Sequence, residues 1–335
     1  MTKVQTYRIL LLILLIGVTS ISFAQNPSWT KVADSVAWQP RDSQGQLVYK
    51  NSMWIFGGWF KSDEAPPRDV WKSTDGIHWE LVTALAPWKH SDFPMVANFR
   101  NKMWIMGGWY NGRLPGHEAG NEVWSSTDGK KWKLETKAPW SPRMAGALVE
   151  FKGRLWLFGG TENYYFGDEK SLKNDIWSSK DGIHWELVTE NAAWSPRAYH
   201  QVAVFKNKLY LMAGGNYTPS YHAHNDVWMS EDGKKWELVT PHAPWHERIW
   251  FTTAVYRDCL WVLGGWSNNP SRNWDDAWYT TDGTTWHLLK TDKKWKERHA
   301  QITLVYKDKI WVAGGMTPPL VNDVWTLSLP KNWKP

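Results

Sequence analysis

The sequence predicts an all-β fold: a six-bladed β-propeller with four antiparallel strands in each blade. Short apolar runs alternate with turn residues along the whole chain. Near-copies of "WSSTDGKKW" (124–132) recur in four of the other repeats, and many of the 29 tryptophans fall at repeated positions. Paired glycines recur about every 50 residues, and a period of this size is typical of propellers, with one sheet per repeat. The pairs are Gly57-Gly58, Gly107-Gly108, Gly159-Gly160, Gly214-Gly215, Gly264-Gly265 and Gly314-Gly315.

Each repeat has the same order of elements. An apolar run such as "GALVEF" is followed by a tight turn such as "KGR", and a second run, "LWLFGG", ends in the paired glycines. A variable loop leads to "NDIWSS", an Asp-Gly turn and "HWELV". Two-residue Asp-Gly connections between alternating apolar residues are hairpin signals. We therefore predict four strands per blade, named a to d from the axis outward.

The N-terminal segment is expected to close the ring. The sixth repeat has strand c, "NDVWTLS" from Asn322, but the chain stops at Pro335 without a strand d. The missing strand matches "SWTKV", residues 28–32, and this closure would pair an otherwise open edge. The predicted blades span about 33–83, 84–136, 137–189, 190–240, 241–290 and 291–329 plus 28–32, in one domain of residues 25–335.

Residues 1–24 read as a signal peptide. Lys3 and Arg8 precede the apolar run 9–18, and small residues lead to a cleavage point near Ala24. The run is about half of the ~20 apolar residues that a membrane span needs. We therefore expect a secreted or periplasmic protein of bacterial type, with no membrane segment after removal of the signal.

Composition limits which classes of partner and which covalent links are expected. Cys259 is the single cysteine, so no internal disulfide is expected. The formal net charge of +6 is mild and its lysines are spread over all repeats, which makes nucleic acid an unexpected partner. We expect a monomer without a cofactor or a bound metal.

Tryptophans outside the repeat mark one face. The repeated ones are expected to pack between blades, since each large ring buries much apolar surface. The a–b and c–d turns are short and uniform, whereas the b–c and d–a loops vary, so the second face should hold the functional residues. The remaining tryptophans are Trp59, Trp109, Trp250, Trp266, Trp274 and Trp333, and all except Trp333 fall at that face.

Arginine opens strand a in five blades. We expect these side chains to circle the channel mouth on the loop-bearing face, where guanidinium groups beside indoles suit an anionic or carboxylate-bearing ligand. The alternative is that each arginine pairs with an aspartate or a backbone carbonyl as part of the repeat. The predicted ligand-binding residues are Arg41, Arg143, Arg197, Arg248, Arg298, Trp59, Trp109, Trp250, Trp266 and Tyr199, and Ser91 replaces the sixth arginine.

Other polar groups are candidates for chemistry. Tyr199 and His200 are possible acid/base groups at the start of strand a. His222 and His224 are spaced for metal binding if a third ligand joins them. A carboxylate beside an arginine is able to move a proton on a sugar. Four acids are expected near the loop-bearing face: Asp42, Asp92, Glu118 and Glu162. For each of these residues, an ordinary surface or packing role is the alternative.

The chain resembles kelch-repeat propellers. The resemblance rests on the paired glycines that end strand b, the aromatic residues before each hairpin turn and the six-fold period, and it covers residues 28–329. It implies a fold shared by enzymes, scaffolds and binding modules. In some of these proteins the strand-opening arginine contacts a ligand. Copper-radical oxidases of this group join a tyrosine to a cysteine, whereas Cys259 lies at an a–b turn on the plain face, so that activity is not expected.

Two functions remain open at this point. The preferred one is an exported binding module that presents aromatic and arginine residues to a glycan or a protein partner. The alternative is a sugar-modifying enzyme, because exported six-bladed kelch propellers include mutarotases that act on sialic acid. No catalytic motif of those enzymes transfers to this sequence residue by residue.

Overall fold

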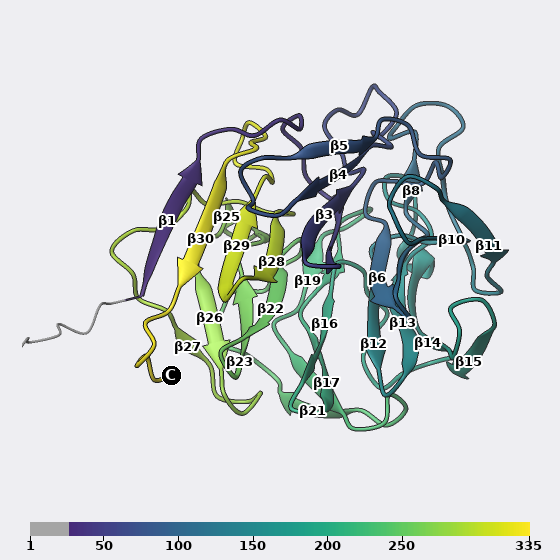
Figure 1. Cartoon of the computed structure of the whole chain (residues 1–335). Coiled ribbons are helices and arrows are strands. Elements are labelled where there is room, and N and C mark those ends of the chain that lie inside the picture. The colour runs from purple at the N-terminus through teal and green to yellow at the C-terminus, as the bar shows by residue number, and fades with distance from the viewer. Residues whose placement is uncertain (1–26) are drawn as a thin grey trace, which may run out of the picture.

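Six four-stranded antiparallel sheets form a ring around a central axis in the computed structural model, which describes residues 27–335 (Figure 1). In each sheet the first strand is innermost. The first three blades are β2 (Gly45–Tyr49), β3 (Ser52–Phe56), β4 (Val70–Ser73) and β5 (Glu80–Thr83); β6 (Met95–Phe99), β7 (Lys102–Met106), β10 (Glu122–Ser126) and β11 (Lys133–Lys137); and β12 (Ala147–Phe151), β13 (Arg154–Thr161), β14 (Leu172–Ser179) and β15 (Trp185–Thr189). The last three are β16 (Gln201–Phe205), β17 (Lys208–Met212), β20 (Val227–Ser230) and β21 (Glu237–Thr240); β22 (Thr252–Tyr256), β23 (Cys259–Leu263), β26 (Ala277–Thr280) and β27 (His287–Leu288); and β28 (Ile302–Tyr306), β29 (Lys309–Ala313), β30 (Val324–Ser328) and β1 (Ser28–Ala33).

The b–c loops of the second, fourth and fifth blades carry small two-stranded ribbons of their own. Across residues 27–335 the helical content is one 3-10 turn, Glu169–Ser171, and no helix is long and apolar enough to cross a membrane. The ribbons are β8 (Trp109–Tyr110) with β9 (Glu118–Ala119), β18 (Gly215–Asn216) with β19 (His222–Ala223), and β24 (Trp266–Asn268) with β25 (Ser271–Asn273). The predicted signal peptide, residues 1–24, lies outside the described residues.

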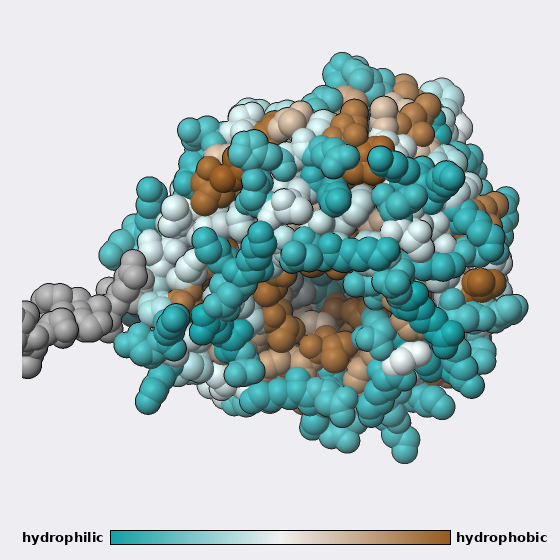
Figure 2. Space-filling view, in the orientation of Figure 1, coloured by the Kyte–Doolittle hydropathy of each residue, from teal (hydrophilic) through white to brown (hydrophobic). Residues whose placement is uncertain are grey.

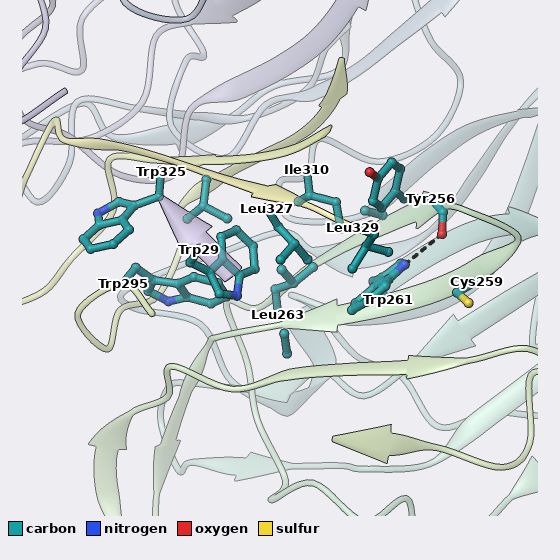
Figure 3. Close-up of a cluster of buried hydrophobic side chains, with 13 residues drawn as sticks. Trp29, Tyr256, Cys259, Trp261, Leu263, Trp295, Ile310, Trp325, Leu327 and Leu329 are labelled. Carbon is teal, nitrogen blue, oxygen red and sulfur yellow. Dashed lines mark hydrogen bonds between the residues drawn. The ribbon is translucent and has the colours of Figure 1, made fainter. Parts of the chain in front are cut away.

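The N-terminal strand closes the ring as the sequence predicted. Strand β1 pairs antiparallel with β30, and Trp29 lies opposite Leu327. The ring of Trp29 meets that of Trp295 edge to face at 4.2 Å, inside the buried cluster between the fifth and sixth blades (Figure 3). The predicted closure and the predicted blade number are therefore confirmed.

The a–b turns and the c–d connections differ in length, although both were predicted to be short turns. The a–b turns are two-residue turns with left-handed backbone, such as Lys50 (φ 45°) and Asn51 (φ 53°), which matches the right-handed twist of the strands. The c–d connection is longer, because Lys72 pairs with Glu80. Its Asp-Gly pair was predicted to form a two-residue hairpin, and that prediction is wrong.

Side chains stabilise the longer c–d connection. Asp75 Oδ1 accepts hydrogen bonds from the backbone N–H groups of Ile77 at 2.9 Å and His78 at 2.8 Å. Ser73 Oγ accepts one from Gly76 N–H at 2.8 Å. Aspartate and serine commonly form such local bonds, which replace strand pairing. The connection therefore has room to turn Trp79 into the core between blades.

Neighbouring blades meet through a tryptophan and a glycine. The glycine of each Asp-Gly turn lies against the strand-b aromatic ring of the preceding blade, and a Cβ on Gly76 would lie 2.2 Å from the ring of Trp311. The other pairs are Gly129 with Trp54, Gly182 with Trp104, Gly233 with Trp156 and Gly283 with Tyr210. The repeated glycine is thus required both by its left-handed backbone and by the ring beside it.

Trp333, which the sequence left without a place, packs in the one position where such a turn is missing. The sixth blade has no c–d turn, because its strand d comes from the N-terminus. Trp261 of the fifth blade therefore lacks a glycine turn to rest on, and the ring of Trp333 lies 6.1 Å from it. The C-terminal tail thus covers an indole that the open ring would leave bare.

Candidate functional site

Six residues with left-handed backbone form a ring around the axis. They precede strand a in every blade, and all have φ between 47° and 59°: Ser43, Phe93, Ala145, Tyr199, Trp250 and Ala300. The N–H of Phe93 donates to the carbonyl of Ser43 at 2.9 Å, and the N–H of Ala300 donates to that of Trp250 at 2.7 Å. Left-handed backbone is uncommon for residues other than glycine and is often found at functional sites. The hydrogen bonds between blades hold this conformation in place.

The large side chains of this ring make an aromatic cluster on the loop-bearing face. The ring of Tyr199 lies 5.4 Å from Phe93 and 5.6 Å from Trp250. Tyr164, from the b–c loop of the third blade, lies over Phe93 at 5.9 Å. The hydroxyl of Thr218, in the next blade, donates to the carbonyl of Tyr164 at 2.6 Å, which ties the two loops together.

An aromatic pocket of about 310 Å³ adjoins this cluster. Its walls come from the first, second, third, fourth, fifth and sixth repeats. Its lining residues are Asp42, Trp59, Ser62, Arg113, Tyr164, Tyr165, Tyr217, Trp250, Trp266, His299 and Met316.

The predicted tryptophans meet around this pocket. Trp59, Trp250 and Trp266 line it. Trp109 is buried behind it, with its ring 6.2 Å from Tyr165. These four tryptophans of the sequence analysis therefore lie together on the loop-bearing face.

A second cavity, of about 210 Å³, lies along the axis below the ring of left-handed residues. Strand-a side chains such as Gln46, Val96 and Leu148 line it. In the space-filling view the molecule is hollowed near its middle, with hydrophobic residues in the hollow and hydrophilic ones around it (Figure 2). Trp250 borders both cavities, so the aromatic cluster separates them.

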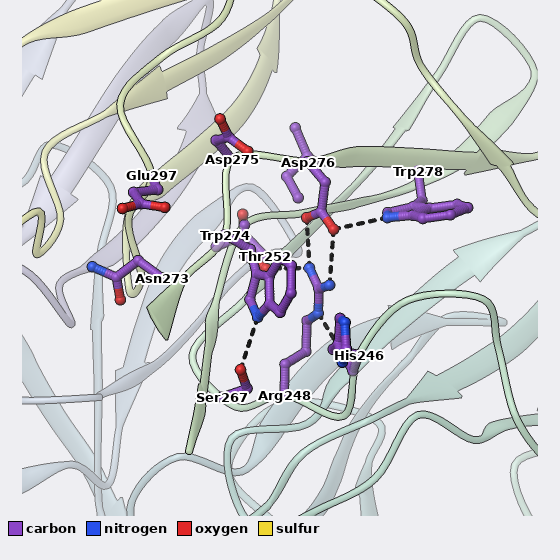
Figure 4. A network of polar contacts seen from close by, with 12 residues as sticks. His246, Arg248, Thr252, Ser267, Asn273, Trp274, Asp275, Asp276, Trp278 and Glu297 are labelled. Carbon is purple, nitrogen blue, oxygen red and sulfur yellow. Dashed lines mark hydrogen bonds and ion pairs between the residues drawn. The ribbon is translucent and has the colours of Figure 1, made fainter. Parts of the chain in front are cut away.

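The five arginines do not face a channel mouth. Each is at most 2% exposed. Arg248 donates to the two carboxylate oxygens of Asp276 at 2.7 and 2.9 Å, and also to the carbonyls of Gly264 and His246 (Figure 4). The same two-point pairing joins Arg41 to Asp69, Arg143 to Asp175, Arg197 to Asp226 and Arg298 to Asp323. This is the alternative arrangement considered above, because the pairing fixes the start of strand a to strand c and leaves the guanidinium groups out of the pocket.

In the second blade, both residues of this arginine–aspartate pair are different. Ser91 stands where the arginine would be, and Glu122 stands where the other blades have aspartate. His90 is buried in the space, with its ring nitrogens 4.0 Å from Glu122 and 3.7 Å from Glu118. Burial lowers the pKa of His90. A histidine therefore fills the site where the guanidinium is absent.

Arg113 lines the aromatic pocket, and the sequence analysis did not name it. It belongs to the b–c loop of the second blade, it is exposed, and its guanidinium lies 4.6 Å above the ring of Tyr165. Within residues 27–335 it makes no salt bridge. Its position in an uncopied loop, beside Asn111-Gly112, was the available signal. The repeat drew attention to the other arginines instead.

Two buried acids lie at equivalent positions in neighbouring blades. Asp42 and Asp92 each follow the arginine position, and the sixth blade has His299 there, whereas the other three blades have Met144, Ala198 and Ile249. Burial raises the pKa of Asp42, and a hydrogen bond from Ser43 lowers it by less, so that the pKa lies at about 7. Burial also raises the pKa of Asp92 well above its usual range, and the charge of Asp42 adds to this. Burial lowers the pKa of His299 to about 3, so its ring is neutral.

The comparisons with known proteins agree with this fold. No protein-family model matches the chain. A stretch of 147 residues is 28% identical to alpha-scruin of Limulus polyphemus, a kelch-repeat protein. Together with the six four-stranded blades, this match makes the chain similar to kelch-repeat propellers. The aligned stretch covers 41% of this chain and 15% of alpha-scruin, so the chain corresponds to a small part of that protein.

The other candidate residues lie apart from the aromatic pocket or contact other side chains. His200 is buried against Trp194 at 5.7 Å, and burial lowers its pKa to about 3. His222 and His224 lie edge to face at 5.7 Å. In the part of the chain that the structure describes, no three histidine, cysteine or acidic side chains are grouped to hold a metal ion. Glu118 pairs with Lys89, and Glu162 pairs with Lys173 at 2.9 Å.

Proposed function

We propose that this kelch-type propeller is a binding protein whose aromatic pocket takes an anionic sugar residue of a glycan. The observation that supports this most directly is the position of Arg113. Its exposed guanidinium lies at the rim of the pocket and over the ring of Tyr165, and none of its N–H groups is committed to an acid within residues 27–335. Arginine binds carboxylates with two parallel hydrogen bonds.

The walls of the pocket suit the rest of such a ligand. Indole and phenol rings give flat apolar surfaces against which the faces of a sugar ring pack, while hydroxyl and imidazole groups offer polar contacts. Ligand pockets commonly have volumes of about 300–1,000 Å³, and this pocket of about 310 Å³ matches one sugar residue at the lower end of that range. An acidic peptide segment of a protein partner is the competing ligand, because it would use the same arginine.

Binding assays with matched variants test this proposal. Titration calorimetry with sialic acid and glucuronic acid should show binding, and uncharged N-acetylglucosamine should bind at least about tenfold more weakly, the equivalent of 1.4 kcal/mol. Arg113→Ala should lose that discrimination. Arg100→Ala is the matched control, because Arg100 also lies over an aromatic ring, that of Phe99, but in an a–b turn on the plain face. Retention of an acidic peptide in place of both sugar acids would favour the protein partner.

One observation supports a second function, sugar epimerisation. The carboxyl of Asp42 lines the pocket, and burial raises its pKa to about 7, which suits a group that gives and takes a proton at neutral pH. Exchange of the two anomers of sialic acid, followed by NMR, tests this activity. Saturable acceleration that disappears in Asp42→Asn would establish it, and anomer exchange at the uncatalysed rate would exclude it for that sugar.

A further inference from the structure

Asp42 and Asp92 are held under the same pocket by backbone pairing. The N–H of Asp42 donates to the carbonyl of Trp59 at 2.9 Å, and Trp59 returns the bond at 2.7 Å. Asp92 and Trp109 are joined in the same way, at 3.2 and 2.8 Å. Neighbouring blades therefore present two carboxyl groups from the same structural position. Asp42 lines the pocket and Asp92 lies wholly buried next to it.

Neither carboxyl group has a cation beside it. Across the described residues no salt bridge reaches Asp42 or Asp92, and both oxygens of Asp92 lack a hydrogen-bond partner. The one side-chain hydrogen bond to Asp42 comes from Ser43 at 2.8 Å. The other titratable groups around them are Arg113 at the rim, His299, and four phenols. Burial and the charges of both acids raise the pKa values of Tyr164 and Tyr165, burial and the charge of Asp92 raise that of Tyr199, and Tyr217 lines the pocket.

These surroundings favour the protonated form of the pair. Burying an unpaired carboxylate costs several kcal/mol, and two carboxylates that share a site do not both ionise readily. Such a pair titrates as a unit, with one proton retained to higher pH than a single aspartate would keep it. A protonated carboxyl group has an O–H that donates a hydrogen bond, whereas a carboxylate only accepts.

We propose that Asp42 contacts the anionic ligand as a hydrogen-bond donor at the floor of the aromatic pocket, and that its burial away from any cation keeps Asp42 in the protonated form that can donate. This inference rests on the proposed function, since it concerns the same pocket. The ligand's anionic or hydroxyl oxygen would be held between Arg113 at the rim and Asp42 at the floor. Ionisation of Asp42 removes the donor and places a negative charge against the ligand, so binding weakens as the pH rises.

The pH profile of binding tests the inference. Dissociation constants of sialic acid and glucuronic acid should be measured by calorimetry from pH 5.5 to 8.5, a range in which both sugar carboxylates stay ionised. We expect the affinity of the wild-type protein to fall at least about tenfold across this range. We expect Asp42→Asn, whose amide keeps a donor at every pH, to bind with a flat profile. Unfolding curves of both proteins at each pH confirm that folded protein is compared.

A second variant separates the roles of the two acids. Asp42 ionises first and its charge raises the pKa of Asp92, so Asp92→Asn leaves Asp42 with an uncharged neighbour as before, and the midpoint of the pH profile should stay near its wild-type value. A flat pH profile in Asp92→Asn would assign the titration to Asp92 and would overturn the inference. As an independent readout, calorimetry near pH 8 in buffers with different ionisation enthalpies should show proton uptake by the wild-type protein on binding.

The outcomes distinguish this inference from the proposed function. Wild-type affinity that does not change with pH, together with loss of binding in Arg113→Ala, overturns the role of Asp42 and leaves the proposed function in place. Absence of binding of either sugar acid at every pH overturns the proposed function and this inference with it. A pH-dependent wild type whose Asp42→Asn variant keeps the same profile assigns the titration to another group and also overturns the inference.

Discussion

Arg248 and Asp276 form a buried two-point ion pair that joins the start of strand a to strand c within one blade (Figure 4). Asp276 also accepts a hydrogen bond from Trp278 Nε1 at 2.9 Å, so a repeated arginine, aspartate and tryptophan act together. The same arrangement recurs in four other blades. The most prominent charged residues of the repeat are therefore architectural, and the site depends on residues that are not copied.

Arg248→Met should destabilise the fold strongly. It leaves the largely buried Asp276 carboxylate without its partner, and breaking one side of a buried ion pair costs about 3–5 kcal/mol. Urea unfolding at pH 7 measures the difference. Arg113→Ala is the control, because an exposed side chain without a salt bridge should change stability by less than about 0.5 kcal/mol. Equal stability of the two variants would contradict the architectural role of Arg248.

Asp42 should make the folded protein less stable as the pH rises. Its pKa is raised from 3.8 to about 7 in the folded state, so between these values the folded protein keeps a proton that the unfolded chain has released. The free energy of unfolding therefore falls from pH 4 to pH 7, and a shift of this size corresponds to about 3–5 kcal/mol. We expect Asp42→Asn to be more stable than wild type at pH 8 and nearly equal to it near pH 4. If the free energies of unfolding of the two proteins changed with pH in the same way, the pKa of Asp42 would not be raised in the folded state.

Asp75 should have the opposite pH dependence. Burial alone would raise its pKa, but hydrogen bonds from His78 and from the backbone of Ile77 lower it to about 2. The folded state then binds fewer protons than the unfolded chain, so this contribution is present above pH 4 and is lost as the pH falls toward 2. Asp75→Asn should be less stable than wild type at pH 7, by up to about 1 kcal/mol because the side chain is half exposed, and the difference should shrink at pH 2.5. Thermal unfolding at the two pH values measures it.

Two glycines with similar backbone angles allow the effect of the contact between blades on stability to be separated from the effect of backbone strain. Gly76 has φ +76° and lies against the ring of Trp311, while Gly116 has φ +79° and has no atom within 4 Å of an added Cβ. Gly76→Ala should therefore cost about 1–3 kcal/mol more than Gly116→Ala, because it adds overpacking to the same backbone strain. Chemical denaturation of both variants provides the comparison. Equal losses would show that the ring of Trp311 moves aside freely.

Trp333→Ala should destabilise the junction of the fifth and sixth blades. Its ring covers Trp261 and lies 5.3 Å from Tyr279, so its removal exposes apolar surface where no Asp-Gly turn is available. We expect a loss of about 1–3 kcal/mol, the range for burying a large apolar side chain. Phe166→Ala, at an exposed loop position, is the control. An unchanged unfolding midpoint for Trp333→Ala would mean that the tail does not contribute to ring closure.

The sequence determined the architecture because its repeat encodes contacts that each blade makes in the same way. The paired glycines, the tryptophans and the unmatched segment 28–32 predicted the blade number and the closure by β1. They also placed Trp59, Trp250 and Trp266 on one face, since strand alternation fixes which loops share a side. The length of the c–d turn was predicted wrongly, because Ser73 and Asp75 satisfy the backbone of that turn through side-chain bonds that a two-residue hairpin does not need.

Only the tertiary structure decided which charged groups are free. Arg248 and Arg113 carry the same guanidinium, but that of Arg248 pairs with Asp276 from a distant strand. Within residues 27–335, that of Arg113 lies over the ring of Tyr165 and pairs with no acid. Likewise, Asp42 and Asp92 lie 50 positions apart in the chain, and the ring of blades places them side by side and away from water. The charge state and availability of a side chain depend on the partners and the burial that folding supplies, and these arise between repeats rather than within one.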